Sequence, residues 1–153
     1  MRSKLIAESE LGRRYVLVLD RGEELMAEVR AFAERERLRA AEFTAIGAVS
    51  AAKLAAFDPD RREYVDIADP GQAELVSLNG RITLPQDADP ANPPPERQLH
   101  VHCVLSREDG SPIAGHVFEL MIRPTCEVFI AESAEQVARR EDPDSGLPVI
   151  ELD

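Results

Sequence analysis

The feature that most constrains this chain is a pair of alternating segments on either side of a tight-turn sequence. Residues 98–106 (QLHVHCVLS) and 113–122 (IAGHVFELMI) alternate in the manner of β-strands. Between them lies Arg107-Glu-Asp-Gly-Ser111. We expect a three-residue loop, Glu108 to Gly110, that forms a type I turn with Gly110 in the left-handed conformation. The sequence therefore predicts an antiparallel hairpin whose register can be counted from its turn.

That register brings all the histidines of the chain together. If Arg107 faces Ser111, His102 lies directly opposite His116 along the ladder. Directly opposed residues project to the same face of a sheet, and so does His100, two positions along the strand. We therefore expect His100, His102 and His116 to converge on one face. A change of one residue in the turn would move His116 to the other face.

Three imidazoles on one rigid strand pair are the protein ligands of an open transition-metal site. Neutral imidazole suits zinc, copper, iron and nickel and suits magnesium or calcium poorly. Three histidines leave the fourth tetrahedral position of zinc for water or substrate, as in catalytic sites. Such an ion lowers the pKa of bound water to about 7 and polarises a carbonyl or phosphoryl oxygen. We predict His100, His102 and His116 as ligands of zinc or another divalent transition metal. The alternative is that His-X-His forms only a polar strand face.

Composition limits the class of protein. The 153 residues are 44% hydrophobic and 31% charged, as in a single globular domain. No stretch is long and apolar enough to cross a membrane, and the N-terminus does not read as a signal peptide, so we expect a cytoplasmic protein. The net charge of −11 argues against nonspecific binding to nucleic acid, because that affinity comes largely from neutralising phosphates.

The remaining pattern predicts an α+β protein with an antiparallel or mixed sheet of about seven strands. One main helix is expected from Glu23 to about Leu38, where apolar residues follow helical spacing. Gly47 is expected at a bulge or a close backbone contact, and Asn79-Gly80 at a turn or bulge. Ser133-Ala-Glu-Gln136 has the form of a capping box and predicts a short C-terminal helix. The expected organisation is an N-terminal extension (1–13), one domain (14–140) and a loosely held tail (141–153).

Two cysteines, a proline-rich stretch and two glutamates are further candidates for a functional role. Cys103 and Cys126 are too few and too far apart for a metal knuckle, so reduced core thiols are expected. The proline-rich stretch from Pro85 to Arg97 is expected to be a surface loop, with a lid over the metal as the alternative. Glu119 should point away from the histidine face, and the position of Glu74 relative to the histidines does not follow from the sequence. The catalytic residues, if there are any, therefore stay unassigned.

Short motifs along most of the chain resemble the PPC domain (plant and prokaryote conserved domain). The resemblance runs from about Arg14 to Glu132. It rests on Arg21-Gly-Glu-Glu24, Ala45-Ile-Gly-Ala48, Glu74-Leu-Val-Ser-Leu-Asn-Gly-Arg-Ile82, Leu99-His-Val-His102, Asp109-Gly110 with Ala114-Gly-His116, and Thr125-Cys-Glu-Val128. It implies a PPC-like fold with an antiparallel sheet and assembly as a homotrimer. It also implies a metal, commonly zinc, on the three histidines already selected.

Two departures from the family pattern limit what the resemblance implies. The family usually has Gly-Gly-His where this chain has Ala114-Gly115-His116. The plant members add an AT-hook that enters the minor groove of DNA, and Gly12-Arg13-Arg14 lacks its proline and basic flanks. The function expected is a homotrimeric metal-binding protein that acts on or senses a small molecule. The alternative is a regulatory or DNA-associated module with a non-catalytic metal, and whether the chain is an enzyme stays open.

Overall fold

The computed structural model describes residues 1–85 and 97–152, which form nine strands and one helix. In chain order these elements are β1 (Arg2–Ser9), β2 (Gly12–Asp20), α1 (Leu25–Arg35), β3 (Ala41–Asp58), β4 (Glu63–Ile67), β5 (Ala73–Pro85), β6 (Gln98–Ser106), β7 (Pro112–Glu132), β8 (Ala138–Glu141) and β9 (Pro148–Ile150). The architecture is thus mostly β, with a mixed sheet. The expectation of about seven strands was slightly low.

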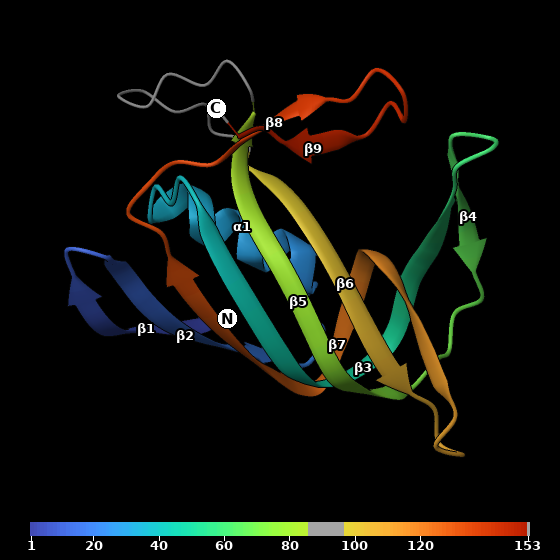
Figure 1. Cartoon of the computed structure of the whole chain (residues 1–153). Helices are drawn as coiled ribbons and strands as arrows, with labels where there is room; N and C mark the ends of the chain where they lie inside the picture. Colours follow the sequence, from blue (N-terminus) through green and yellow to red (C-terminus); the bar gives the residue numbers. More distant parts are fainter. Residues whose placement is uncertain (86–96, 153) are drawn as a thin grey trace.

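The sheet is organised around two long strands, β3 and β7, which pair with each other antiparallel over most of their length. β5 pairs with β3 on one side and β6 on the other, and β6 returns to the start of β7. The pairings of β3, β5, β6 and β7 therefore close on themselves, and β2 and β1 extend the sheet beyond β7. Figure 1 shows the resulting sheet curving around α1.

Helix α1 is fixed to the sheet at both its apolar face and its N-terminus. The side chain of Glu24 caps the helix by accepting from the backbone N–H groups of Met26 (3.0 Å) and Ala27 (2.7 Å). The same carboxylate accepts from the N–H of Leu120 on β7 at 2.9 Å. The predicted apolar stripe is confirmed, because its residues are buried in the core with the strand interiors. These buried helix residues are Leu25, Met26, Val29, Phe32 and Ala33.

Two glycines inside the long strands have different roles. At Gly47 the register of β3 shifts against both neighbours, and a Cβ there would lie 2.4 Å from the carbonyl oxygen of Thr125. The predicted bulge and close contact are confirmed. At Gly80, however, β5 continues without a turn. A Cβ at Gly80 would lie 2.2 Å from the ring of Phe43, so this glycine makes room for a buried aromatic side chain.

The predicted C-terminal helix at residues 133–136 is wrong. The N–H of Ser133 donates to the carbonyl of Ala40 at 2.9 Å, which holds the chain beside the sheet as it leaves β7, and residues 133–137 form no helical turn. It then forms β8, which pairs with β5 in parallel, and the antiparallel strand β9. The residues predicted as an N-terminal extension include β1, which pairs with β2. The assignment of 1–13 and 141–153 as regions outside the domain stays a prediction.

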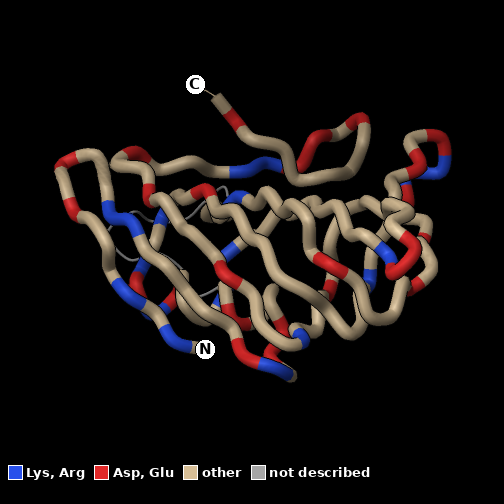
Figure 2. Tube along the Cα trace, turned by 90° about the horizontal axis from the view of Figure 1, so that it is seen from below, with Lys and Arg blue, Asp and Glu red and all other residues tan. Residues whose placement is uncertain are grey.

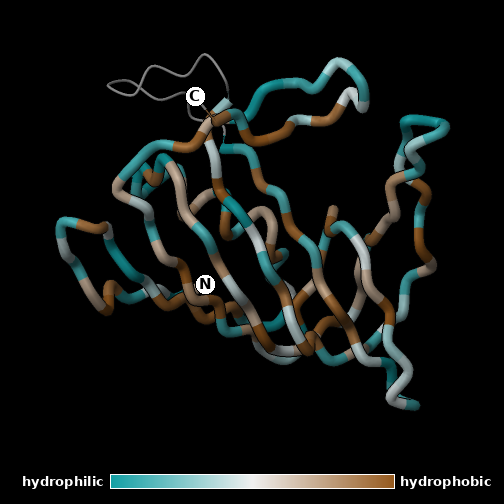
Figure 3. Tube along the Cα trace, in the orientation of Figure 1, coloured by the Kyte–Doolittle hydropathy of each residue, from teal (hydrophilic) through white to brown (hydrophobic). Residues whose placement is uncertain are grey.

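The interior follows the alternation of the strands. Hydrophobic and hydrophilic positions succeed each other along β3, β5, β6 and β7 in Figure 3. Cys103 and Cys126 are buried and unpaired, as predicted, and burial raises the pKa of their thiols to about 11 and about 12. None of the helices in the described part of the chain is long and apolar enough to span a membrane. The predicted surface loop or lid, from Pro85 to Arg97, lies outside the described residues except at its two ends.

Candidate metal centre

The hairpin that carries the histidines has the predicted turn and register. The N–H of Gly110 donates to the carbonyl of Arg107 at 2.8 Å, and the N–H of Arg107 donates to the carbonyl of Ser111 at 3.0 Å. Gly110 has φ +80°, the left-handed conformation that glycine adopts without strain. Counting from this turn, His102 lies opposite His116. The local prediction that places both side chains on one face is therefore confirmed.

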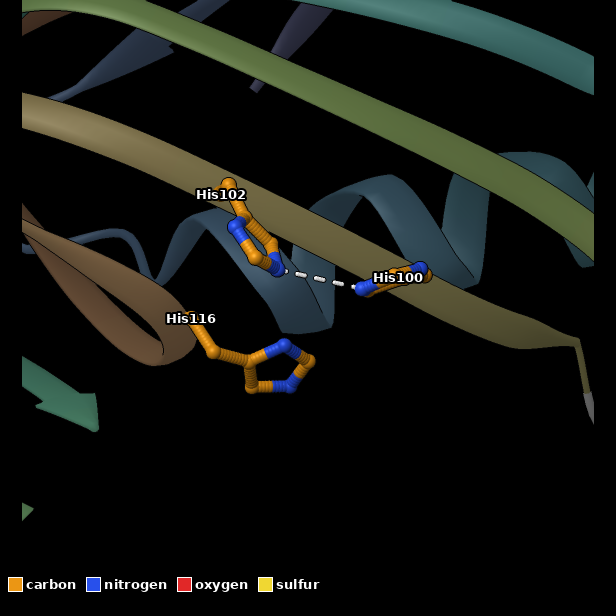
Figure 4. Close-up of side chains that lie close together, drawn as sticks. All are labelled: His100, His102 and His116. Atoms are coloured by element: carbon orange, nitrogen blue, oxygen red, sulfur yellow. Dashed lines mark hydrogen bonds between the residues drawn. The ribbon is translucent and has the colours of Figure 1, made fainter. Parts of the chain in front are cut away.

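The three imidazoles enclose a common space, two from β6 and one from β7 (Figure 4). Ring centroids are 5.0 Å apart for His100 and His102, and 5.4 Å apart for each of the other two pairs. One ring nitrogen from each of the three histidines lies within 4.8 Å of the others. The Nε2 atoms of His100 and His102 are 3.1 Å apart. Tetrahedral zinc with Zn–N bonds of 2.0–2.1 Å requires ligand nitrogens about 3.3 Å apart. The spacing suits a single ion after small rotations of the rings.

The Nδ1 atom of His116 is buried and has no hydrogen-bond partner among the described residues. A buried polar atom without a partner is costly, so it needs an explanation such as an ion or a water molecule. The side chains of Tyr64 and Phe118 flank the ring, with centroids 4.8 Å and 5.0 Å away. The aromatic neighbours leave this imidazole in a largely apolar setting.

The electrostatics of the site disfavour the protonated forms of His116 and His100. The pKa of His116 is lowered to about 4, first by burial and then by the nearby His100 and His102. The pKa of His100 is also lowered, first by burial and then by the positive charges of Arg139 and Arg81 and by His102. Metal ions bind the unprotonated ring nitrogen, so both effects reduce competition from protons.

A cavity of about 610 Å³ opens beside the histidines. Its wall includes His100 and His116, Tyr64 of β4, and residues of the C-terminal β8–β9 hairpin. Sequence reasoning missed Tyr64 and Arg139. Phe118, two residues after His116, was available from strand alternation. The position of Tyr64 depends on the pairing of β4 with β3, and that of Arg139 on the pairing of β8 with β5.

Gly115 allows the close approach of strands at this site. A Cβ at this position would lie 2.9 Å from both the carbonyl oxygen of Ala55 and the Cδ1 atom of Ile67. Glycine therefore lets β3 and β4 pack directly against the residue before His116. The neighbouring Ala114 is exposed, so its methyl group is accommodated where the family usually has glycine.

The two candidate carboxylates of the sequence, Glu74 and Glu119, lie away from this cavity. Glu74 faces Ser106 on β6, and Glu119 faces Lys53 on β3. Neither lines the cavity beside the histidines. Among the described residues that do line it there is no Asp or Glu. No general base is therefore assigned.

Comparisons with known proteins agree with this fold. A model of the Plants and Prokaryotes Conserved (PCC) domain, the family that the sequence resembles, matches residues 6–134. A metal-containing protein from Archaeoglobus fulgidus is 30% identical with a TM-score of 0.80, over 95% of this chain and 97% of that chain. A plant- and prokaryote-conserved (PPC) protein from Pyrococcus horikoshii is 28% identical with a TM-score of 0.79, over 93% of each chain. A protein from Bacteroides thetaiotaomicron has a TM-score of 0.83 over 97% of this chain and 96% of that chain. At 22% identity, its likeness concerns the fold alone. No curated protein matches the sequence.

Proposed function

The chain belongs to the Plants and Prokaryotes Conserved (PCC) domain family, and from this premise we propose that it is a metal-binding protein that handles a small molecule. In this proposal His100, His102 and His116 hold one zinc ion, or another divalent transition metal, with a coordination position open to the neighbouring cavity. The bound ion would supply Lewis acidity and a water of lowered pKa. The protein's own residues orient the ligands, disfavour protonation of His100 and His116, and shape the cavity.

The convergence of the three imidazoles carries this proposal. Their nitrogens lie within 4.8 Å of one another, and one of them, Nδ1 of His116, is buried without a partner among the described residues. His100 and His102 are exposed and His116 is partly buried, so the support comes from the convergence of the ring nitrogens and from the buried Nδ1 atom of His116. The relative from Archaeoglobus fulgidus, described as metal-containing, adds support at 30% identity.

We further propose that the protein assembles as a homotrimer, as the family resemblance implies. Large apolar side chains are exposed on adjacent strands: Ile46 of β3 (58%), Val76 of β5 (55%) and Phe129 of β7 (50%). Ile46 lies at the register shift between β3 and β5, and Val76 lies at the same shift on β5. On the other side of β3, Phe129 of β7 lies opposite Thr44, two residues from Ile46. Burying this patch between copies would remove it from water. Light scattering should give about three times the 16.9 kDa chain mass, and Ile46→Glu should lower it.

The direct test is elemental analysis of untagged protein beside a His102→Ala variant. We expect about one zinc per chain in the wild type and a large loss in the variant. Asn79→Ala is the matched control, because Asn79 lies opposite His102 on β5 and is exposed. It should keep its metal. An absence of bound metal after incubation with zinc would contradict the proposal.

A regulatory module with a non-catalytic metal is the second candidate. It is favoured by the lack of a carboxylate among the described lining residues, since metal-assisted hydrolysis commonly uses a general base. DNA association is less well supported. The net charge is −11, and Lys and Arg are dispersed among Asp and Glu along the trace in Figure 2. Substrate turnover by the zinc-loaded protein that is lost in folded His102→Ala would favour catalysis over regulation.

A further inference from the structure

The cavity beside the histidines is positively charged, although the protein as a whole is acidic. Arg30, Arg97 and Arg139 line it, together with His100 and His116, and none of the described lining residues is acidic. The whole chain carries a net charge of −11. Three arginines gathered in one concave site of such a protein favour a negatively charged ligand.

Arg139 is the best-defined donor in this cavity. Its residue is 7% exposed, its NH1 donates to the carbonyl of Pro148 at 2.8 Å, and its NH2 donates to Nδ1 of His100 at 3.3 Å. Its Nε is buried without a hydrogen-bond partner in the described structure. No ion pair is formed by this guanidinium with the part of the chain described here. A buried cation normally has an anionic partner, so a ligand is the natural candidate for that place.

Arg30 provides a second donor from a separate element, helix α1. Its NH1 makes a long contact of 3.4 Å with the carbonyl of Arg97, and it forms no ion pair within residues 1–85 and 97–152. The negative charge of Glu34 attracts the guanidinium of Arg97, so the charge of Arg97 is partly balanced. Arg30 and Arg139 thus bring positive charge to the cavity from two separate elements, α1 and β8.

The rest of the wall is largely apolar. Its hydrophobic residues are Leu99, Leu147, Pro148, Val149 and Ile150. Val149 and Ile150 of β9 are 40% and 43% exposed, which is high for such side chains beside a cavity. The volume of about 610 Å³ lies in the range of small-molecule sites. An anionic head with a short apolar body fits both parts of this wall.

We propose that the cavity binds a small organic anion, a carboxylate or a phosphate, whose head lies between Arg30 and Arg139 beside the three histidines. The apolar body lies against the β8–β9 hairpin, which follows the last residue of the family match, residue 134. The assignment of this anion as the ligand of the metal rests on the proposed metal centre. The arginine site itself does not.

Calorimetric titration of metal-free and zinc-loaded protein tests the proposal. The three ligands are pentanoate, pentylphosphonate and pentylamine, which share an apolar chain and differ in the head. We expect at least one anion to bind about tenfold or more tightly than pentylamine, and the two anions to show which head is preferred. Arg139→Gln and Arg30→Gln should each weaken that anion about tenfold, as expected for one charge-assisted hydrogen bond.

Arg140→Gln is the matched control, because Arg140 is exposed on the same strand and pairs with Glu151 at 3.1 Å. It should leave affinity unchanged. If Arg139→Gln does not fold, Arg30→Gln on α1 carries the test. Equal binding of pentylamine, or unchanged anion affinity in the folded arginine variants, would overturn the proposal. Arginine-dependent binding without zinc uptake would instead overturn the metal centre and leave the anion site standing.

Discussion

Two hairpins border the same cavity, and they are held in place in different ways. The β6–β7 hairpin belongs to the main sheet, where β6 pairs with β5 and β7 pairs with β3 and β2. Among residues 1–85 and 97–152, the β8–β9 hairpin pairs with the main sheet at two positions, Leu84 with Ala138 and Pro85 with Arg139. The first carries the three histidines and the second carries Arg139. The candidate metal ligands thus lie on the firmly held element, and the proposed anion donor lies on the weakly attached one.

This difference suggests a division of work. A metal site needs ligands held close to a fixed geometry, which a strand pair inside a sheet supplies. A ligand-binding wall can be exchanged without disturbing that geometry if few contacts attach it. Changes in the β6–β7 hairpin should therefore affect the metal and the global stability, whereas changes in β8–β9 should affect ligand choice.

The largest expected effect comes from removing a histidine. His116→Ala should weaken zinc binding at least about 100-fold, because even the loss of an outer partner of a metal ligand costs about 10–100-fold. Arg139→Gln should change zinc affinity less than about threefold. Competition with a fluorescent zinc chelator measures both. A comparable loss in the two variants would mean that the two hairpins are not functionally separate.

The second expected effect is a fall in the stability of the metal-free protein in acid. The pKa of His116 is about 4 in the folded protein, below its ordinary value of 6.5. The unfolded chain therefore binds a proton first, and stability falls as the pH is lowered from about 6.5 to about 4. The slope for this one group is at most about 1.4 kcal/mol per pH unit. It is smaller in practice because the ring is partly exposed.

Urea unfolding of the metal-free protein at a series of pH values measures this slope. His116→Gln keeps a polar side chain of similar length and removes the titrating group. In that variant the part of the slope between pH 6.5 and 4 that belongs to His116 should disappear. An identical slope in both proteins would show that His116 does not remain neutral when the chain folds.

The β6–β7 hairpin could be predicted from sequence because its geometry is local. The turn residues specify a loop length and the left-handed position at Gly110, and the period of two then fixes the face of every side chain. The same local reasoning located α1 and the bulge at Gly47. The prediction of a turn or bulge at Asn79-Gly80 was wrong, because Gly80 makes room for the ring of Phe43 on the neighbouring strand β3.

The β8–β9 hairpin could not be predicted in this way. Its attachment is a parallel pairing between residues more than fifty positions apart, and no turn sequence announces it. The capping-box pattern at Ser133 predicted a helix, but the N–H of Ser133 donates to the carbonyl of Ala40 beside β3, and the chain continues to strand β8. The histidines of the candidate site were therefore accessible to sequence reasoning, whereas Arg139 and Tyr64 depended on long-range packing.

The third expected effect is a difference in how the two hairpins respond to the same glycine-to-alanine substitution. Gly110 (φ +80°) and Gly146 (φ +72°) lie in the turns of the two hairpins, and a Cβ at either would meet nothing within 4 Å. Alanine should therefore cost about 1 kcal/mol of local strain at both. In Gly110→Ala this should appear as lost global stability. In Gly146→Ala it should appear only as faster amide exchange near β9, because that hairpin can open by itself.

Urea unfolding and hydrogen exchange together separate these outcomes. Equal losses of global stability in the two variants would show that β8–β9 unfolds with the main sheet. In that case β8–β9 would not open independently of the main sheet, although the metal ligands and the anion donor would still lie on different hairpins.

The smallest expected effect links the two hairpins electrostatically. The positive charge of Arg139 is one cause of the lowered pKa of His100, but it is not among the causes acting on His116. Arg139→Gln should therefore raise the pKa of His100 toward 6.5 and leave that of His116 near 4, in the metal-free protein.

Proton NMR titration of the imidazole ring signals resolves the pKa values of the two histidines. Arg140→Gln should move neither pKa, because Arg140 pairs with Glu151 and is not among the causes of either shift. If Arg139→Gln leaves the pKa of His100 unchanged, the guanidinium does not contact that ring in solution. If His100 alone responds, β8–β9 lies against the metal centre in solution and influences its ligands without being one.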